Sequence, residues 1–413
     1  MTGEAANPPA NPAANPAANP PANPFAGLFA EAERQLTICN ACRYCEGYCA
    51  VFPALERRRE LTSGDITHLA DLCHDCRDCY TACMYAPPHE FAINPPAVLS
   101  AVRRHTYDEY LPRLPWPASR RGAIAAAALA SVAVLASLAV WIGGAGAAGG
   151  AGAARGSAAA AGSPYQVIAY PALLAAVGLP ALWSVVVMAR SGARYWRATG
   201  GRGLTRPTAL RAALRQAATL RNLRGGGAEC SYPADEPSAA RRRLHGFVAW
   251  GFLACVASTV AAAISQDIAG DPPPYPVLSA PVLLGIAGGA GLIVGCGGLL
   301  VLRRRAARAA GGGDAARADP ALKDPALRDQ ALRDQALEDP ALARRGYALL
   351  TGLLLLAVTG LLTLVLRDSA AFAPVLGIHL AAVVACFAIA PYTKFMHVVY
   401  RFLALVHDNA EPI

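Results

Sequence analysis

Apolar residues gather in six long stretches after residue 120 of this 413-residue chain. Each stretch is close to the roughly 20 residues that an α-helix needs to cross a bilayer, so we expect six transmembrane helices. Glycine and other small residues are abundant within them, as is common where membrane helices pack closely. The expected spans are residues 122–143, 165–188, 245–265, 277–302, 347–366 and 372–392.

The chain before the first span has a different pattern. Residues 1–24 repeat Asn-Pro and Ala-Ala without a periodic apolar face, which predicts a disordered tail rather than a signal peptide. Residues 25–117 are more polar; segments 31–38 and 56–72 have helical periodicity, and no run alternates like a strand. We therefore expect a mainly α fold, with a compact helical domain over 25–117 and a six-helix membrane domain over 118–408 that carries a low-complexity insert at 306–343.

Charge and composition refine this division. A hydrophobic content of 54% is high for a soluble protein. The net charge of +9 could indicate a nucleic-acid partner, but the basic residues are not interleaved with aromatic ones. Instead, arginines concentrate in 190–243 and at both ends of 303–345, whereas the alternate connections are nearly free of positive charge. By the positive-inside rule, we expect a multi-pass protein of the inner (cytoplasmic) membrane with both termini in the cytoplasm.

Eight of the 12 cysteines form two runs with the same spacing, C-x2-C-x2-C-x3-C. Such paired runs are typical of two [4Fe–4S] clusters, in which the fourth cysteine of each run ligates the other cluster. We therefore assign Cys39, Cys42, Cys45 and Cys83 to one cluster, and Cys73, Cys76, Cys79 and Cys49 to the other. The alternative of structural zinc is weaker, because zinc sites usually take their thiolates as two separated pairs, and disulfides are weaker still without a secretory signal.

Three histidines lie at or within the expected spans: His245, His379 and His397. We expect His245 and His397, at the same cytoplasmic depth, to be the two axial ligands of a b-type haem. On one continuous helix, His379 and His397 would project from the same face about 27 Å apart. No other histidine within the spans is available to pair with His379, which disfavours a second bis-histidine haem. His379 is kept as a candidate for a second haem or a quinone site, with a hydrogen bond to a neighbouring helix as the alternative. The plainer alternatives are that His397 snorkels to the interface with Lys394 and Arg401 and that His245 only begins a helix.

Two groups of residues carry a resemblance to known families. The cysteine runs, the loop Gly225-Gly226-Gly227 with Cys230, and the sequence Arg241-Arg242-Arg243-Leu-His245 resemble the tricarballylate/citrate utilisation protein B family. The ending Gly377-Ile-His379 with Pro391-Tyr-Thr-Lys394-Phe-Met-His397 is similar to the last helix of the respiratory nitrate reductase gamma subunit, where both histidines bind haem. That subunit has two histidines ten residues apart on a facing helix. Here Cys255 occupies the second position, so we expect one haem.

The resemblance implies a membrane electron-transfer protein. It would reoxidise an FAD-dependent partner dehydrogenase at the cytoplasmic face and pass electrons through two [4Fe–4S] clusters and haem b to quinone in the lipid. The chain itself has no dinucleotide fingerprint in a βαβ context, which favours a separate flavoprotein. The remaining alternatives are a membrane subunit of another respiratory or heterodisulfide-type oxidoreductase, a non-catalytic iron–sulfur redox sensor, and a transporter with a zinc-bearing regulatory domain.

Overall fold

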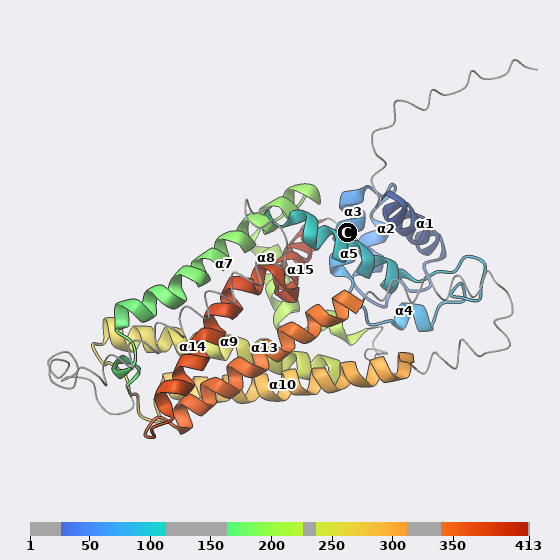
Figure 1. The fold of residues 1–413 in the computed structure, drawn as a ribbon. Helices are drawn as coiled ribbons and strands as arrows, with labels where there is room; N and C mark the ends of the chain where they lie inside the picture. The colour runs from blue at the N-terminus through green and yellow to red at the C-terminus, as the bar shows by residue number, and fades with distance from the viewer. Residues whose placement is uncertain (1–25, 113–162, 226–236, 312–339, 412–413) are drawn as a thin grey trace, which may run out of the picture.

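The computed structural model describes residues 26–112, 163–225, 237–311 and 340–411, and within these ranges it contains helices but no strand. Long helices lie side by side in one bundle, and a group of shorter N-terminal helices sits at one end of it (Figure 1). The mainly α fold that the sequence predicts is confirmed. The predicted tail 1–24 and the predicted first span 122–143 lie outside the described residues, as do Cys230 and most of the insert 306–343.

The N-terminal domain consists of five helices. They are α1 (Ala26–Cys42), α2 (Val51–Glu56), α3 (Ser63–Leu72), α4 (Asp78–Thr81) and α5 (Pro95–Tyr110). The helix predicted at 31–38 lies within α1. The helix predicted at 56–72 is wrong in its first part, because a capping box begins a new helix: the Thr62 side chain accepts from the Asp65 amide, and Asp65 accepts from the Thr62 amide.

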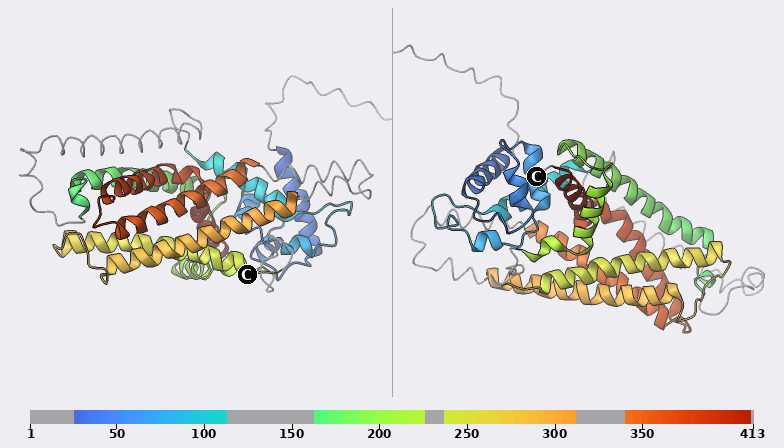
Figure 2. Two further views of the ribbon diagram at one scale, coloured as in Figure 1. Left: turned by 60° about the horizontal axis from the view of Figure 1, so that its bottom comes forward. Right: turned by 180° about the vertical axis from the view of Figure 1, so that it is seen from behind.

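Five of the helices are long and apolar enough to cross a membrane. They are α7 (Tyr170–Ala198), α9 (Ala240–Ala263, extended by a π turn to Ile268), α10 (Ala280–Gly311), α13 (Pro340–Val365) and α14 (Phe372–Ile389). Adjacent helices pack in the order α9, α10, α13, α14, α7. In the right-hand view of Figure 2, α7 and α14 run at an angle to α9 and α10.

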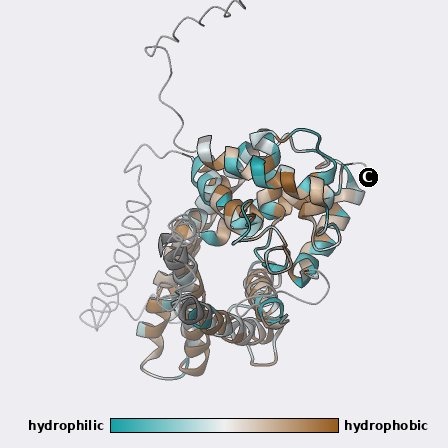
Figure 3. Cartoon of the chain, turned by 90° about the vertical axis from the view of Figure 1, so that its right-hand side faces the viewer, coloured by the Kyte–Doolittle hydropathy of each residue, from teal (hydrophilic) through white to brown (hydrophobic). Residues whose placement is uncertain are grey.

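Small residues explain why α9 and α10 form the most extensive helix pair. A Cβ on Gly251 would lie 2.9 Å from the Gly288 carbonyl oxygen, and a Cβ on Gly288 would lie 2.6 Å from the Cys255 Sγ. Close backbone approach of this kind is typical of membrane helix pairs. On its outer side α9 exposes large apolar residues such as Phe247, Trp250 and Val260, as expected of a helix that contacts lipid. In the end-on view of Figure 3, polar residues are most frequent in the N-terminal helices that face the viewer.

The last helix that the sequence predicts is interrupted in the structure. α14 ends at Ile389, two short 3-10 turns follow (Ala390–Tyr392 and Lys394–Met396), and a separate helix, α15 (His397–Asp408), begins at His397. Pro391 lacks the amide hydrogen that would continue the helix, and the extended Thr393 separates the two turns. The expectation that His379 and His397 share one continuous helix face is therefore wrong.

The helix α15 joins the N-terminal domain to the membrane bundle. Its Tyr400, Ala404 and Leu405 belong to the same buried core as Leu36 of α1 and Leu69 of α3. Helix α8 (Pro207–Ala218), which the sequence analysis did not predict, packs against the other side of α15.

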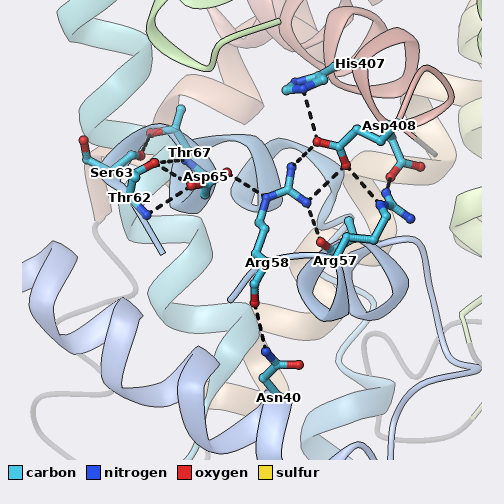
Figure 4. A network of polar contacts seen from close by, with 11 residues as sticks. Asn40, Arg57, Arg58, Thr62, Ser63, Asp65, Thr67, His407 and Asp408 are labelled. Carbon is cyan, nitrogen blue, oxygen red and sulfur yellow. Dashed lines mark hydrogen bonds and ion pairs between the residues drawn. The ribbon is translucent and has the colours of Figure 1, made fainter. Parts of the chain in front are cut away.

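An ion-pair network closes this contact (Figure 4). Arg58, which follows α2, bonds both Asp65 (2.8 Å) and Glu411 (2.8 Å), while Arg57 bonds Asp408 and Glu411 (3.1 Å). The N-terminal helices are thus fixed to the segment that follows the last membrane span.

Candidate redox sites

The first predicted cysteine set is brought together at one side of the N-terminal domain. Cys39 and Cys42 lie in the last turn of α1, Cys45 follows in the next turn, and Cys83 comes after α4. All four line one cavity, whose other walls include Ile38, Phe52, Ile93 and Pro95. Burial and then repulsion from the Cys83, Cys45 and Cys42 thiolates raise the pKa of Cys39 to about 12, and burial with the Cys83 and Cys42 charges raises that of Cys45 to about 11.

The second predicted set, Cys73, Cys76, Cys79 and Cys49, is also brought together. Cys49 belongs to this set although it is the fourth cysteine of the first run in the sequence. Burial and then the nearby charges of Cys73 and Cys76 raise the pKa of Cys49. Burial followed by the charges of Cys73, Cys49 and Cys76 raises that of Cys79. Cys49 therefore lies among the thiols of the second run, whereas Cys83 lies among those of the first.

Both sets suit a polynuclear iron–sulfur group. Mutual repulsion would keep these buried thiols protonated by themselves, and a metal centre that binds thiolates removes this cost. Apolar side chains such as Ile38 and Phe52 line one side of the first set, and solvent exposure is one of the factors that tune cluster potentials. The two groups of four cysteines are thus suitable ligand sets for two iron–sulfur clusters.

The backbone between Cys73 and Cys76 is held from three directions. Arg103 of α5 and Arg401 of α15 donate to the Cys73 carbonyl at 2.8 and 2.7 Å. Arg241 of α9 donates to the carbonyls of His74 (2.9 Å) and Asp75 (2.6 Å). Asp75 has a positive φ of 54°, so this loop bends sharply between the two cysteines.

The histidines predicted as a haem pair face each other. His245 lies in the second turn of α9 and His397 begins α15; their ring centroids are 6.1 Å apart and their planes form an angle of 51°. Two imidazoles on opposite sides of one metal would have centroids about 6 Å apart, given metal–nitrogen bonds of about 2.0 Å. The structure therefore brings together the pair named from the sequence.

The protonation of His397 also suits a metal ligand. Its Nδ1 donates to the Lys394 carbonyl, which leaves Nε2 as the free acceptor, the arrangement common in metal-ligating histidines. Burial, followed by the charges of His245 and Arg401, lowers the pKa of His397 to about 3. The ring is therefore neutral at physiological pH, as an axial ligand must be. These residues fit a bis-histidine haem.

His379 occupies a different place. Its Nδ1 lies 3.0 Å from the Thr359 Oγ1 of α13, and its ring approaches Gly360 so closely that a Cβ there would lie 3.0 Å from Cε1. Of the roles expected for His379, the structure contains the hydrogen bond to a neighbouring helix, α13.

The arginines that hold the cysteine loop are functional residues that the sequence pattern did not predict. Arg401 was interpreted as a partner for interfacial snorkelling, but its guanidinium turns inward to Cys73. One signal was available: Arg241 precedes His245 by four residues and Arg401 follows His397 by four, so each shares a helix face with its histidine.

The fold and the clustered cysteines together define a class: a helical membrane protein with a ferredoxin-like N-terminal domain. A family model described as the citrate utilization protein B Fer4-like domain matches residues 32–109, and one described as citrate utilization protein B matches residues 129–324 and 328–412. The chain is 38% identical over 378 residues to "Citrate utilization protein B" of Escherichia coli, and the alignment covers 91% of both proteins. This chain belongs to the citrate utilization protein B family. No solved structure matches it.

Proposed function

We propose that this protein is a membrane electron carrier that reoxidises the flavin of an FAD-dependent dehydrogenase and reduces quinone. The dehydrogenase would oxidise a tricarboxylate such as tricarballylate, since the family name refers to the utilization of citrate, itself a tricarboxylate. The reduced flavin gives up two electrons and two protons, and a quinone takes up two of each to become a quinol. One observation carries the proposal: the Cys73–Cys76 loop and the His245/His397 pair lie at the same end of the membrane bundle, joined by Arg241 and Arg401.

The cofactors in this proposal are held by residues of both domains. Cys39, Cys42, Cys45 and Cys83 bind one [4Fe–4S] cluster, and Cys73, Cys76, Cys79 and Cys49 bind the second. His245 and His397 are the axial ligands of haem b. When bound, these groups supply one-electron redox chemistry, and the protein sets their spacing and potentials. His379, hydrogen-bonded to Thr359 of α13, stays outside this ligand set.

The orientation in the membrane follows from the same arrangement. The arginine-rich ends of α7, α9 and α10 lie at the end of the bundle that carries the N-terminal domain. The positive-inside rule places that end in the cytoplasm. A reducing compartment favours thiolate ligands and a soluble flavoprotein partner. We therefore propose a multi-pass inner-membrane protein with both termini on the cytoplasmic side.

The cofactor content of the purified full-length protein tests this proposal. We expect iron and acid-labile sulfide for two [4Fe–4S] clusters, and a dithionite-reducible b-type haem band. His245→Ala and His397→Ala should each abolish the haem band, because a bis-histidine haem needs both ligands. His379→Ala is the matched control within the membrane domain and should retain the band.

Different outcomes would refute different parts. Zinc without sulfide would refute the iron–sulfur assignment. Loss of haem only in His379→Ala would refute the ligand pair. Full cofactor content without electron transfer from a reduced flavoprotein to a quinone analogue would favour a redox sensor instead.

A further inference from the structure

The two helices that carry the predicted haem ligands also hold the Cys73–Cys76 loop. Arg241 lies one helical turn before His245 on α9, and Arg401 lies one turn after His397 on α15. Each arginine therefore points to the same side of its helix as the histidine. Both guanidinium groups end on backbone carbonyls of the loop, at 2.6–2.9 Å.

The two cysteine sets differ in their surroundings. In the second set, Cys73 and Cys76 are 8% and 9% exposed, and their loop lies against the membrane domain. In the first set, Cys42 is exposed. The cavity that the first set lines is bordered by Tyr44 and Met84, which are 57% and 63% exposed. The first set thus has an exposed side at Cys42, whereas Cys73 and Cys76 of the second set are buried in the loop that the histidine-bearing helices hold.

Charge adds to this difference. Arg103, Arg241 and Arg401 all donate to the backbone beside Cys73, so at least three guanidinium groups surround the second set. An iron–sulfur cluster becomes more negative by one charge when it accepts an electron. Nearby positive charge in a poorly solvated site stabilises the reduced form and raises the reduction potential.

We propose that Arg241 and Arg401 are positioning residues that fix the Cys73–Cys76 loop against His245 and His397 and raise the potential of the cluster held there. The outward cluster on the Cys39 set then receives electrons from the partner, and the cluster on the Cys73 set is the one that delivers them to the haem. Each delivery moves one electron, so the cluster is oxidised and the haem iron reduced by one unit, with no bond made or broken. This inference rests on the proposed function.

The test measures the potentials of both clusters in the full-length protein, by redox titration followed with electron paramagnetic resonance. Cys42→Ser and Cys76→Ser identify which signal belongs to which set. In Arg401→Gln and Arg241→Gln, we expect the reduced-to-oxidised ratio of the Cys73-set cluster at a fixed potential to fall about tenfold, a shift of about 59 mV to lower potential. The Cys39-set cluster should keep its potential.

Matched variants separate charge from structure. Arg401→Lys and Arg241→Lys retain the charge and should restore most of the potential. Arg197 is an exposed arginine of α7 that donates to a carbonyl of its own helix. Arg197→Gln should therefore change the potential of neither cluster. If a glutamine variant loses its clusters, the corresponding lysine variant provides the test. The proposal is supported if that lysine variant has the cluster content and the Cys73-set potential of the wild type, and it is contradicted if its clusters are present at a lower potential.

Two results would overturn the inference. One is an unchanged Cys73-set potential in both glutamine variants with normal iron and sulfide content. The other is an equal shift of both clusters, which would show that the arginines do not distinguish the two sets. Neither result affects the proposed function, which fails if the unmodified protein lacks the clusters or haem, or does not transfer electrons to a quinone analogue.

Discussion

Glu411→Gln should loosen the N-terminal domain from α15. Glu411 accepts from Arg58 (2.8 Å) and Arg57 (3.1 Å), and its carboxylate lies 3.3 Å from the His407 Nε2. Arg58 is only 7% exposed at its side chain, so removal of the carboxylate charge leaves a buried cation with Asp65 as its remaining acidic partner. The variant keeps the size of the side chain and removes only the charge.

The expected magnitude follows from the pKa of Glu411. Its hydrogen bond to His407 and the charge of Arg58 outweigh the effect of burial, which by itself would raise this pKa, and the net result is a pKa of about 2 instead of 4.5. At 1.36 kcal/mol per pKa unit, this shift corresponds to about 3 kcal/mol. Solvent still reaches the carboxylate and screens it, so we expect a cost of about 2 kcal/mol in the variant at pH 7.

The pH dependence has a definite sign. A carboxyl group whose pKa is lower in the folded state stabilises that state fully above its unfolded pKa. For Glu411 this contribution is complete above pH 4.5 and is lost as the pH falls toward about 2. The titration of Glu411 itself should therefore add no pH dependence between pH 6 and 8.

Hydrogen–deuterium exchange of the detergent-solubilised protein measures this cost. A loss of about 2 kcal/mol makes local opening about thirtyfold more frequent, and the amides of α15 and α3 should exchange faster by that factor. Glu31→Gln is the matched control, because it breaks the exposed Glu31–Arg34 pair, which should be worth less than about 1 kcal/mol. The reasoning would be refuted if Glu411→Gln changed exchange no more than Glu31→Gln.

Two further predictions concern packing and a buried carboxyl group. Gly288→Ala places a Cβ 2.6 Å from the Cys255 Sγ and should destabilise the α9–α10 pair by about 1–3 kcal/mol; Gly297→Ala, with open space at its Cβ, should leave the thermal midpoint in detergent unchanged. Tyr107→Phe removes the hydroxyl that donates to Asp71 at 2.8 Å and should cost about 1–3 kcal/mol. Because burial raises the pKa of Asp71 to about 6, this loss should be larger at pH 7 than at pH 5 in thermal unfolding, and a loss independent of pH would contradict the assignment.

Much of the fold could be predicted because its signals are local. A run of about 20 apolar residues needs no tertiary information to identify a membrane helix, and five of the six expected spans coincide with helices that have the required length and composition. The pairing of His245 with His397 was also available, since both residues adjoin the ends of spans that the arginine pattern predicts to lie on one side of the membrane. Their facing arrangement in the structure agrees with that depth argument.

The errors came from features that depend on single residues or on distant contacts. Pro391 lies in an apolar sequence that otherwise continues the helical pattern, so the break before α15 was missed. The docking of α15 on α3 joins segments more than 300 residues apart, and no local pattern indicates it. The spacing of Arg401 from His397 is a local signal, but its acceptor carbonyl belongs to the distant Cys73.

The placement of α15 also determines the order in which the molecule is assembled. The N-terminal domain is synthesised first, yet the surface on which it docks follows the last membrane helix in the chain. The Arg58–Glu411 contact can therefore form only after α7, α9, α10, α13 and α14 have all been synthesised.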